Sequence, residues 1–172
     1  MMKKFLALLG AVVVGGAVLS ACGETEVKDV SGDKKEEAKE EKKDENKVYG
    51  VGDTVSVDGM EITVKSAKFT DPTQYTKAKN GKVLTLEVTA KNSNDEQAFI
   101  DNSEFAVYDK DGNKVDDYFG YDEIAISGNV NAGKQMQGKV YFDVPEQDSY
   151  ELLYTPSFSM DSKEVKFDIK VK

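Results

Sequence analysis

The sequence contains no histidine, no arginine and no tryptophan, and it has one cysteine among 172 residues. Without histidine the chain lacks the usual general base of hydrolases and the commonest zinc ligand. Without arginine it has no planar guanidinium group that could clamp a phosphate through two hydrogen bonds. Its formal net charge of −9 also repels nucleic acid. We therefore exclude a serine–histidine–aspartate triad and nucleic-acid binding.

The single cysteine follows the pattern of a lipid-attachment site. Lysines at the start of the chain precede an apolar run from Phe5 to Leu19, which is too short to span a bilayer comfortably. Ser20 and Ala21 then lead into Cys22. This order resembles a bacterial lipobox, in which the thiol sulfur receives a diacylglyceryl group and cleavage leaves Cys22 as the acylated N-terminus. We predict that residues 1–21 are a lipoprotein signal peptide.

Lipidation of Cys22 would place the protein on the extracytoplasmic face of the cell membrane. The absence of arginine excludes a twin-arginine export signal. With its only cysteine acylated, the chain has no disulfide, so the folded domain depends on its core alone. Cleavage removes Lys3 and Lys4 but no acid, and the formal charge moves from −9 to −11.

The segment after Cys22 is charged and poor in apolar residues. Residues 23–47 contain ten acids and seven lysines, with Val27, Val30 and Ala38 as the only apolar side chains. Such a segment buries too little surface to offset the entropy of ordering it, and like charges at i,i+4 oppose a helix. We therefore predict that residues 22–47 are a disordered tether, with a span on the order of 25–30 Å, that adds nothing to stability.

From Val48 onward apolar and polar residues alternate with a period of two, which is the pattern of half-buried strands. The alternating runs are 84–90, 140–144, 150–154 and 165–171, and the turn signals are Asp58-Gly59, Asn80-Gly81 and Asp111-Gly112. The pattern predicts an all-β fold. Seven to eight short strands in 125 residues favour an immunoglobulin-like antiparallel β-sandwich over residues 48–172.

Four short motifs occur in a fixed order along this domain: Val-Gly-Asp-Thr-Val at 51–55, Thr-Ala-Lys-Asn-Ser-Asn-Asp-Glu at 89–96, Tyr-Asp-Lys-Asp-Gly at 108–112, and Gly-Lys-Val-Tyr-Phe-Asp-Val-Pro at 138–145. They resemble the immunoglobulin-like (telokin-like) domain of unknown function found on many Gram-positive lipoproteins. The resemblance covers about Val48 to Lys172. It implies an extracellular β-sandwich with no established activity and no catalytic residues to carry over.

Residues 116–123 are the best candidate for a recognition surface. They read Asp-Asp-Tyr-Phe-Gly-Tyr-Asp-Glu, so four acids surround three aromatic residues. Aromatic faces beside carboxylates could hold a cationic ligand. The candidate ligand-binding residues are Asp116, Asp117, Tyr118, Tyr121, Asp122 and Glu123. The alternative is a crossover between the sheets whose rings cover the core while its acids face water.

A second acidic motif resembles the start of a calcium loop. Asp109, Asp111 and Asn113 alternate as oxygen-bearing residues, but glycine stands at the fourth place of the motif instead of the sixth. The glutamate expected at the twelfth place is replaced by Gly120. We therefore predict a hairpin turn, no metal site and no cofactor, and these three residues are the ligands that a calcium-binding alternative would use.

These observations predict a non-catalytic binding or interaction module at the outer face of the cell membrane. Its partners would be the membrane, through the lipid on Cys22, and an envelope protein or a cell-wall component. The alternatives are a calcium- or small-cation-binding module and a hydrolase that uses a carboxylate pair. Substrate delivery to a transporter fits poorly, because such receptors usually bind between two α/β lobes and this chain has one β domain.

Overall fold

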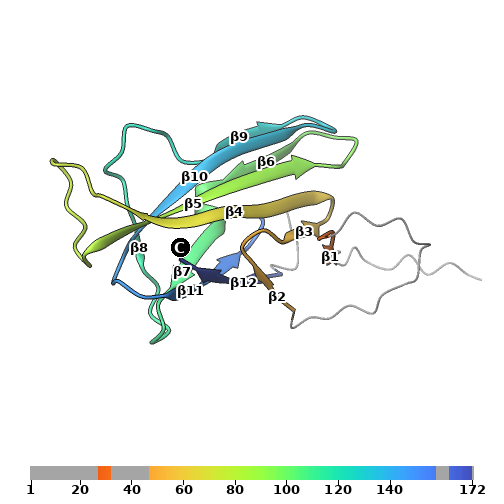
Figure 1. Ribbon diagram of the computed structural model, residues 1–172. Coiled ribbons are helices and arrows are strands. Elements are labelled where there is room, and N and C mark those ends of the chain that lie inside the picture. The colour runs from red at the N-terminus through yellow and green to blue at the C-terminus, as the bar shows by residue number, and fades with distance from the viewer. Residues whose placement is uncertain (1–26, 32–46, 158–162, 172) are drawn as a thin grey trace, which may run out of the picture.

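Two β-sheets stack face to face in the computed structural model, which describes residues 27–31, 47–157 and 163–171 (Figure 1). The described strands are β1 (Val27–Asp29), β2 (Val48–Gly50), β3 (Thr54–Val57), β4 (Met60–Thr70), β5 (Lys82–Asn92), β6 (Ala98–Asp101), β7 (Phe105–Tyr108), β8 (Asp116–Asp117), β9 (Ser127–Val130), β10 (Gln135–Val144), β11 (Ser149–Tyr154) and β12 (Val165–Lys170). A short 3-10 helix, η1 (Asn102–Glu104), precedes β7. The predicted all-β sandwich is confirmed.

The larger sheet has the order β1-β3-β4-β5-β10-β8, and all its pairs are antiparallel. The facing sheet has the order β2-β12-β11-β7, in which β2 and β12 run parallel. Strands β6 and β9 form a separate two-stranded ribbon. The connections bring segments from distant parts of the sequence together at each end of the sandwich, where loops can act jointly.

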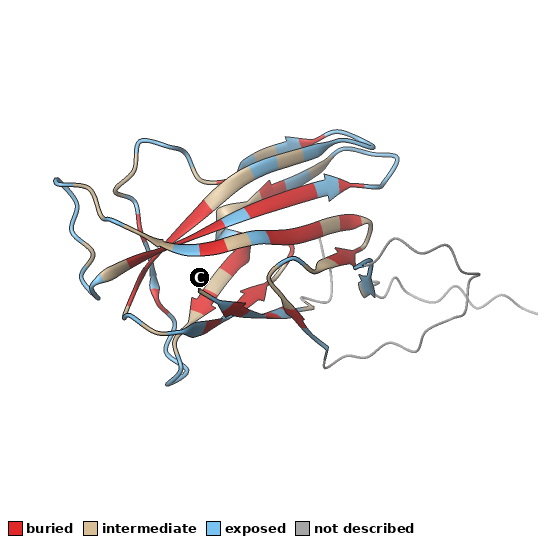
Figure 2. Cartoon of the chain, viewed as in Figure 1, coloured by how far each residue is buried: buried red, intermediate tan, exposed pale blue. Residues whose placement is uncertain are grey.

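The alternating residues form the core, as predicted. Leu84, Leu86 and Val88 of β5 are fully buried, and so are Phe167 and Ile169 of β12. The burial pattern along β12 alternates without a break. On β5 and the second half of β10 consecutive residues are buried, and Figure 2 shows buried residues in red on the strands of both layers. A period of two in the sequence therefore identifies which face of each strand points between the sheets.

The predicted hairpin at Asp58-Gly59 is present. Val57 pairs with Met60, and both turn residues have positive φ angles, 45° at Asp58 and 81° at Gly59. A type I′ turn requires this conformation, which glycine adopts without steric cost. The β3–β4 hairpin and its turn lie at one end of the sandwich.

A β-bulge shifts the phase of the long strand β4. The pairing with β5 is irregular between Val64 and Ser66, so Lys65 is the extra residue. Inward positions change from Ile62 and Val64 before the bulge to Ala67 after it, and all three are buried. The bulge allows one strand to keep its apolar residues toward the core although the sequence alternation slips by one.

Two sequence expectations need correction. Within residues 48–172 the described part of the chain contains eleven strands, β2 to β12, instead of seven to eight, because strands of two to four residues are too short to show a clear alternation. A further strand, β1, lies within the predicted tether: Val27 pairs with Val57, and Asp29 pairs with Val55. The tether prediction is therefore wrong for residues 27–31. Of its other residues, Lys47 is described and forms an ion pair with Asp29, and the rest, including Cys22, lie outside the described residues, as do residues 1–21.

Candidate functional site

The predicted recognition segment begins as an edge strand and continues as a crossover. Asp116 and Asp117 form β8 and pair with Asp143 and Phe142 of β10. The N–H of Tyr118 extends this ladder by donating to the carbonyl oxygen of Tyr141 at 2.8 Å. The chain then crosses the outer face of the larger sheet toward β9. The segment therefore connects the larger sheet to the β6–β9 ribbon, and its tyrosine rings pack in a cluster separate from the main core.

The hydroxyl groups of Tyr118 and Tyr121 hold the loop that follows β4. Tyr118 is 4% exposed; its hydroxyl accepts from the Thr73 N–H at 2.8 Å and donates to the Thr76 carbonyl oxygen at 2.6 Å. The Tyr121 hydroxyl donates to the Asp71 carbonyl oxygen at 2.7 Å. Both side chains therefore fasten residues 71–76 to the crossover.

The rings of these tyrosines pack against one another. The ring centroids of Tyr118 and Tyr121 are 5.1 Å apart, and those of Tyr121 and Tyr141 are 4.8 Å apart. With Val83 they form a small cluster on the outer face of the larger sheet. Burial raises the pKa of Tyr141, and the neighbouring Glu123 raises it further. The described arrangement uses these ring faces for packing.

Among the predicted acids, Glu123 has a defined partner. The ammonium of Lys139 donates to its carboxylate at 2.7 Å and holds the pKa of that carboxyl below its usual value. Asp116, Asp117 and Asp122 are exposed. The structure thus gives Tyr118 and Tyr121 structural contacts, with Tyr118 buried, and leaves the four acids at the surface.

The buried carboxylate of Asp143 binds the other end of the same loop, near β5. This residue was not identified from the sequence. Asp143 is 4% exposed, and its two oxygens accept the N–H groups of Lys79 at 2.6 Å and Asn80 at 2.8 Å. The loop between β4 and β5 is thereby held by Tyr118, Tyr121 and Asp143. The sequence offered a signal for it, since Asp143 stands in an alternating apolar strand directly before Val144 and Pro145.

Two exposed aromatic side chains lie on the segments that these contacts fix. Tyr75 is 87% exposed in the middle of the loop, and Phe119, next to Tyr118, is 79% exposed. We refer to residues 71–81 and 118–122 together as the loop end. Both are large side chains in water, and the loops that carry them are held by buried polar groups. The sequence reasoning missed Tyr75 because a lone aromatic residue in a polar stretch has no periodic neighbour.

The acidic motif at 109–113 forms a turn. One carboxylate oxygen of Asp109 accepts the N–H groups of Asp111 at 2.9 Å and Asn113 at 2.8 Å. These hydrogen bonds, chiefly those from Asn113, hold the pKa of Asp109 below its usual value. The described parts of the chain contain no group of three or more cysteine, histidine or acidic side chains placed to hold a metal ion.

The described surface has open depressions, one of them beside some of the predicted residues. One open depression is lined by residues of the 109–116 turn together with Asn80 and the segment 145–147. A second lies along β2, β11 and β12. Of the six predicted ligand-binding residues, Asp116 lines the first depression, together with Asp109, Asp111 and Asn113 of the acidic motif. Neither depression is lined by Tyr118, Tyr121, Asp122 or Glu123. Within the described ranges, no helix has the length and apolar character needed to cross a membrane.

This fold and these loops define a β-sandwich module with a fixed loop end. The sequence matches the family described as a domain of unknown function, DUF4352, over residues 49–165. The chain belongs to this family, which confirms the resemblance to lipoprotein domains of Gram-positive bacteria.

The relatives are consistent with that assignment. The lipoprotein YcdA of Bacillus subtilis, which is named as uncharacterised, is 29% identical over 119 residues that make up 67% of this chain and 34% of the relative. This chain therefore spans about a third of its length. The YcdA crystal structure aligns with a TM-score of 0.57 at 30% identity, covering 64% of this chain and 36% of that chain. The yjhA protein of Bacillus subtilis aligns with a TM-score of 0.55 at 20% identity, covering 73% and 100%.

Proposed function

We propose that the chain is a lipid-anchored binding module that acts at the outer face of the cell membrane and recognises its partner with the loop end. The observation that supports this proposal is the contrast, at the loop end, between exposed aromatic side chains and the buried groups that fix their loops. Tyr75 and Phe119 are exposed, whereas the groups that fix their loops, Tyr118 and Asp143, are buried. The lipoprotein relative and the lipobox before Cys22 support the anchored location.

The physical basis is preorganisation. A loop that orders only when it binds spends part of the interaction free energy on its own entropy, and a loop already fixed does not. Exposed aromatic rings supply large contact area with few rotatable bonds, and such residues dominate the energetics of many interfaces. The absence of histidine from the sequence, and relatives without an enzymatic name, support a non-catalytic role.

The recognition surface is tested by photo-crosslinking in cells that produce the lipid-modified chain. A photoreactive amino acid at position 75 or 119 should yield a discrete crosslinked product, whereas one at Phe99 should not. Phe99 is the matched control because it is also an exposed aromatic residue, 45% exposed, and lies on β6. Equal yields at all three positions would contradict the assignment of the loop end.

The class of ligand is tested with the soluble domain in thermal-shift titrations against calcium, spermidine and purified cell-wall fragments. A saturable shift that is lost in Tyr75→Ala and Phe119→Ala but kept in Phe99→Ala would identify a ligand of the loop end. A calcium shift that is lost only in Asp109→Asn would instead support the cation-binding alternative.

The anchor is tested by membrane fractionation of the wild-type chain and Cys22→Ala. We expect the wild type in the membrane fraction, and the variant as an unprocessed precursor or in the soluble fraction. A processed variant that remains bound to the membrane would show that the lipid assignment is wrong. Two acyl chains would make the attachment stable, since one chain alone binds only marginally.

A further inference from the structure

Strand β1 of the folded domain begins at Val27, five residues after the proposed lipid site at Cys22. Val27 packs against the core, and β1 pairs with β3 along its length. The strand is extended by the Val30 N–H, which donates to the Thr54 carbonyl oxygen at 3.0 Å, and by the Thr54 N–H, which donates to Oγ of Ser31 at 2.7 Å. Asp29 also forms an ion pair with Lys47. Residues 27–31 are therefore part of the folded domain.

The position of β1 identifies one end of the sandwich. Val27 lies opposite Val57, directly before the Asp58-Gly59 turn. That turn contacts the segment after β5, because the Ser93 N–H donates to the Gly59 carbonyl oxygen at 2.8 Å. We refer to the Asp58-Gly59 turn and residues 93–96 as the anchor end.

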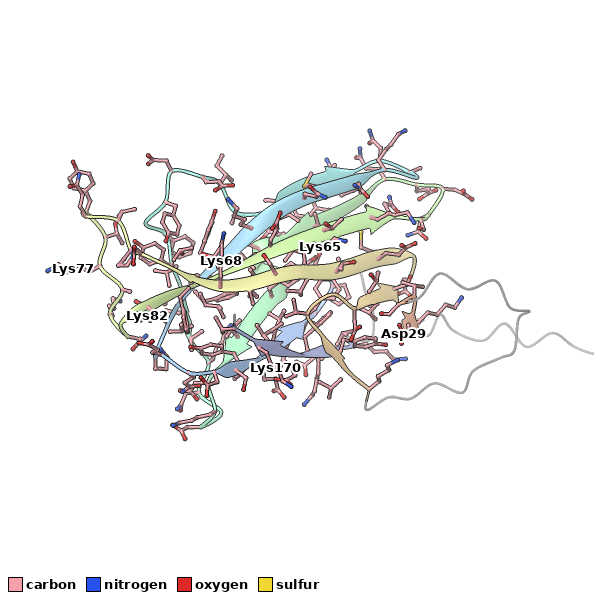
Figure 3. The ribbon with its side chains drawn as sticks, in the orientation of Figure 1. Asp29, Lys65, Lys68, Lys77, Lys82 and Lys170 are labelled. Carbon is pink, nitrogen blue, oxygen red and sulfur yellow. The ribbon has the colours of Figure 1, made fainter. Side chains whose placement is uncertain are left out.

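The loop end lies at the opposite end of the same strands. Strand β5 runs from Lys82, beside the loop end, to Asn92, beside the anchor end, and its eleven residues span roughly 33 Å. Figure 1 shows β1 and the loop between β4 and β5 at opposite ends of the molecule. In Figure 3, Asp29 on β1 and Lys77 on that loop mark the same separation.

Few residues separate the proposed lipid site at Cys22 from the first residue of β1. Four residues, 23–26, separate Cys22 from Val27, so five Cα–Cα steps connect them. Even fully extended, this length of chain spans no more than about 18 Å. A free spacer of 25 residues would let the domain move much further from the lipid. Because β1 is paired with β3, residues 32–46 lie between two strands of the domain and add nothing to the distance between Cys22 and β1.

We propose that the anchor end faces the lipid surface at a distance of no more than about 18 Å, and that the loop end points away from it. The partner that faces the anchor end is thus the lipid bilayer. Exposed Asp95 and Glu96 at this end are repelled by anionic lipids within a Debye length of about 8–10 Å, which keeps a short gap between domain and headgroups. This geometry rests on the proposed anchor at Cys22 and gives the recognition surface its direction.

The test uses the mature chain, residues 22–172, coupled through the Cys22 thiol to maleimide-headgroup lipid in vesicles of phosphatidylcholine and phosphatidylglycerol. Chemical coupling replaces biological lipidation, so a failure here is distinct from a failure of the Cys22→Ala fractionation. A fluorescent amino acid at position 95 or 74 serves as donor, and a headgroup-labelled lipid serves as acceptor. We expect stronger energy transfer from position 95 than from position 74.

Two matched insertions then distinguish the case in which β1 is paired with the domain from the case in which residues 23–47 are a free spacer. Eight Gly/Ser residues are inserted either between residues 26 and 27 or between residues 38 and 39, and unchanged melting midpoints show that both variants fold. The first insertion should increase the apparent distance from position 95 to the lipid by roughly 15 Å, and the second should leave it unchanged. Equal effects of the two insertions, or transfer from position 74 that equals or exceeds that from position 95, would overturn the proposal.

Discussion

At the scale of single residues, the fold depends on a few polar groups that the loops bury. Asp143 points to the outer face of the larger sheet, as the alternation of β10 requires, yet the loop between β4 and β5 covers it. A carboxylate between two backbone N–H groups satisfies donors that would otherwise lack partners at this position. Its role is to fix the loop that carries Tyr75.

Replacing this carboxylate should destabilise the domain. Asp143→Ala leaves the N–H groups of Lys79 and Asn80 without their acceptors, and we expect it to lower the free energy of unfolding by about 1–3 kcal/mol. Urea denaturation measures the change. Asp168→Ala is the matched control, because Asp168 is exposed on β12 and its carboxylate lies 3.8 Å from the ammonium of Lys170. Equal losses in the two variants would show that the buried contacts of Asp143 contribute nothing.

Glu104 is a second buried carboxyl, and it makes stability depend on pH. One of its oxygens accepts the Ser157 N–H at 2.9 Å, and the other has no hydrogen-bond partner among the described residues. Burial raises its pKa above the usual value of 4.5. The folded state therefore binds this proton more tightly than the unfolded state does. The contribution to stability is fully present below the unfolded pKa and is lost as the pH rises through the folded pKa.

Glu104→Gln removes the ionisation and keeps an oxygen that accepts from Ser157. We expect the free energy of unfolding of this variant to fall less than that of the wild type between pH 4.5 and neutral pH. Urea denaturation at a series of pH values provides the measurement. Glu151→Gln, at an exposed position on β11, should keep the wild-type slope. A slope in Glu104→Gln that matches the wild type would contradict a raised pKa at Glu104.

At the scale of elements, the sequence predicts strands where alternation is long and uninterrupted. It identifies β5, β11, β12 and the second half of β10, because their inward residues are apolar and their outward residues mostly polar. It underestimates the burial of the outer face of β5, where Val83 and Thr85 are also covered. Their cover comes from segments far away in the sequence, and a local pattern carries no information about such contacts.

The strand with the cleanest alternation offers the sharpest test of the core. Phe167 of β12 is fully buried, and its ring centroid lies 5.7 Å from that of Tyr49. Phe167→Asp places a charge between the sheets, and we expect the domain to unfold, because the cost exceeds the typical stability of about 5–15 kcal/mol. Circular dichroism should show loss of the strand signal. Lys170→Asp, which adds a charge at an exposed position of the same strand, should remain folded; a folded Phe167→Asp would contradict the predicted inward face.

At the scale of the whole molecule, the sequence predicts the class of fold but not the arrangement of the candidate site. The segment 116–123 was identified by its composition, and the structure shows that its tyrosines hold a loop some forty to fifty positions earlier in the sequence. Which of its residues remain exposed depends on that loop. That Phe119 and Tyr75 are both exposed becomes apparent only when both segments are placed in the sandwich.

The parallel pairing of β2 with β12 has a consequence for how quickly the protein folds. Val48 pairs with Lys166, which lies 118 positions later in the sequence. Contacts between such distant positions close slowly, which is typical of β-sandwiches that fold in milliseconds to seconds. We therefore expect the pairing of β2 with β12 to form late in folding. With three residues, β2 presents a short unpaired edge until then, and a short edge is a poor template for aggregation.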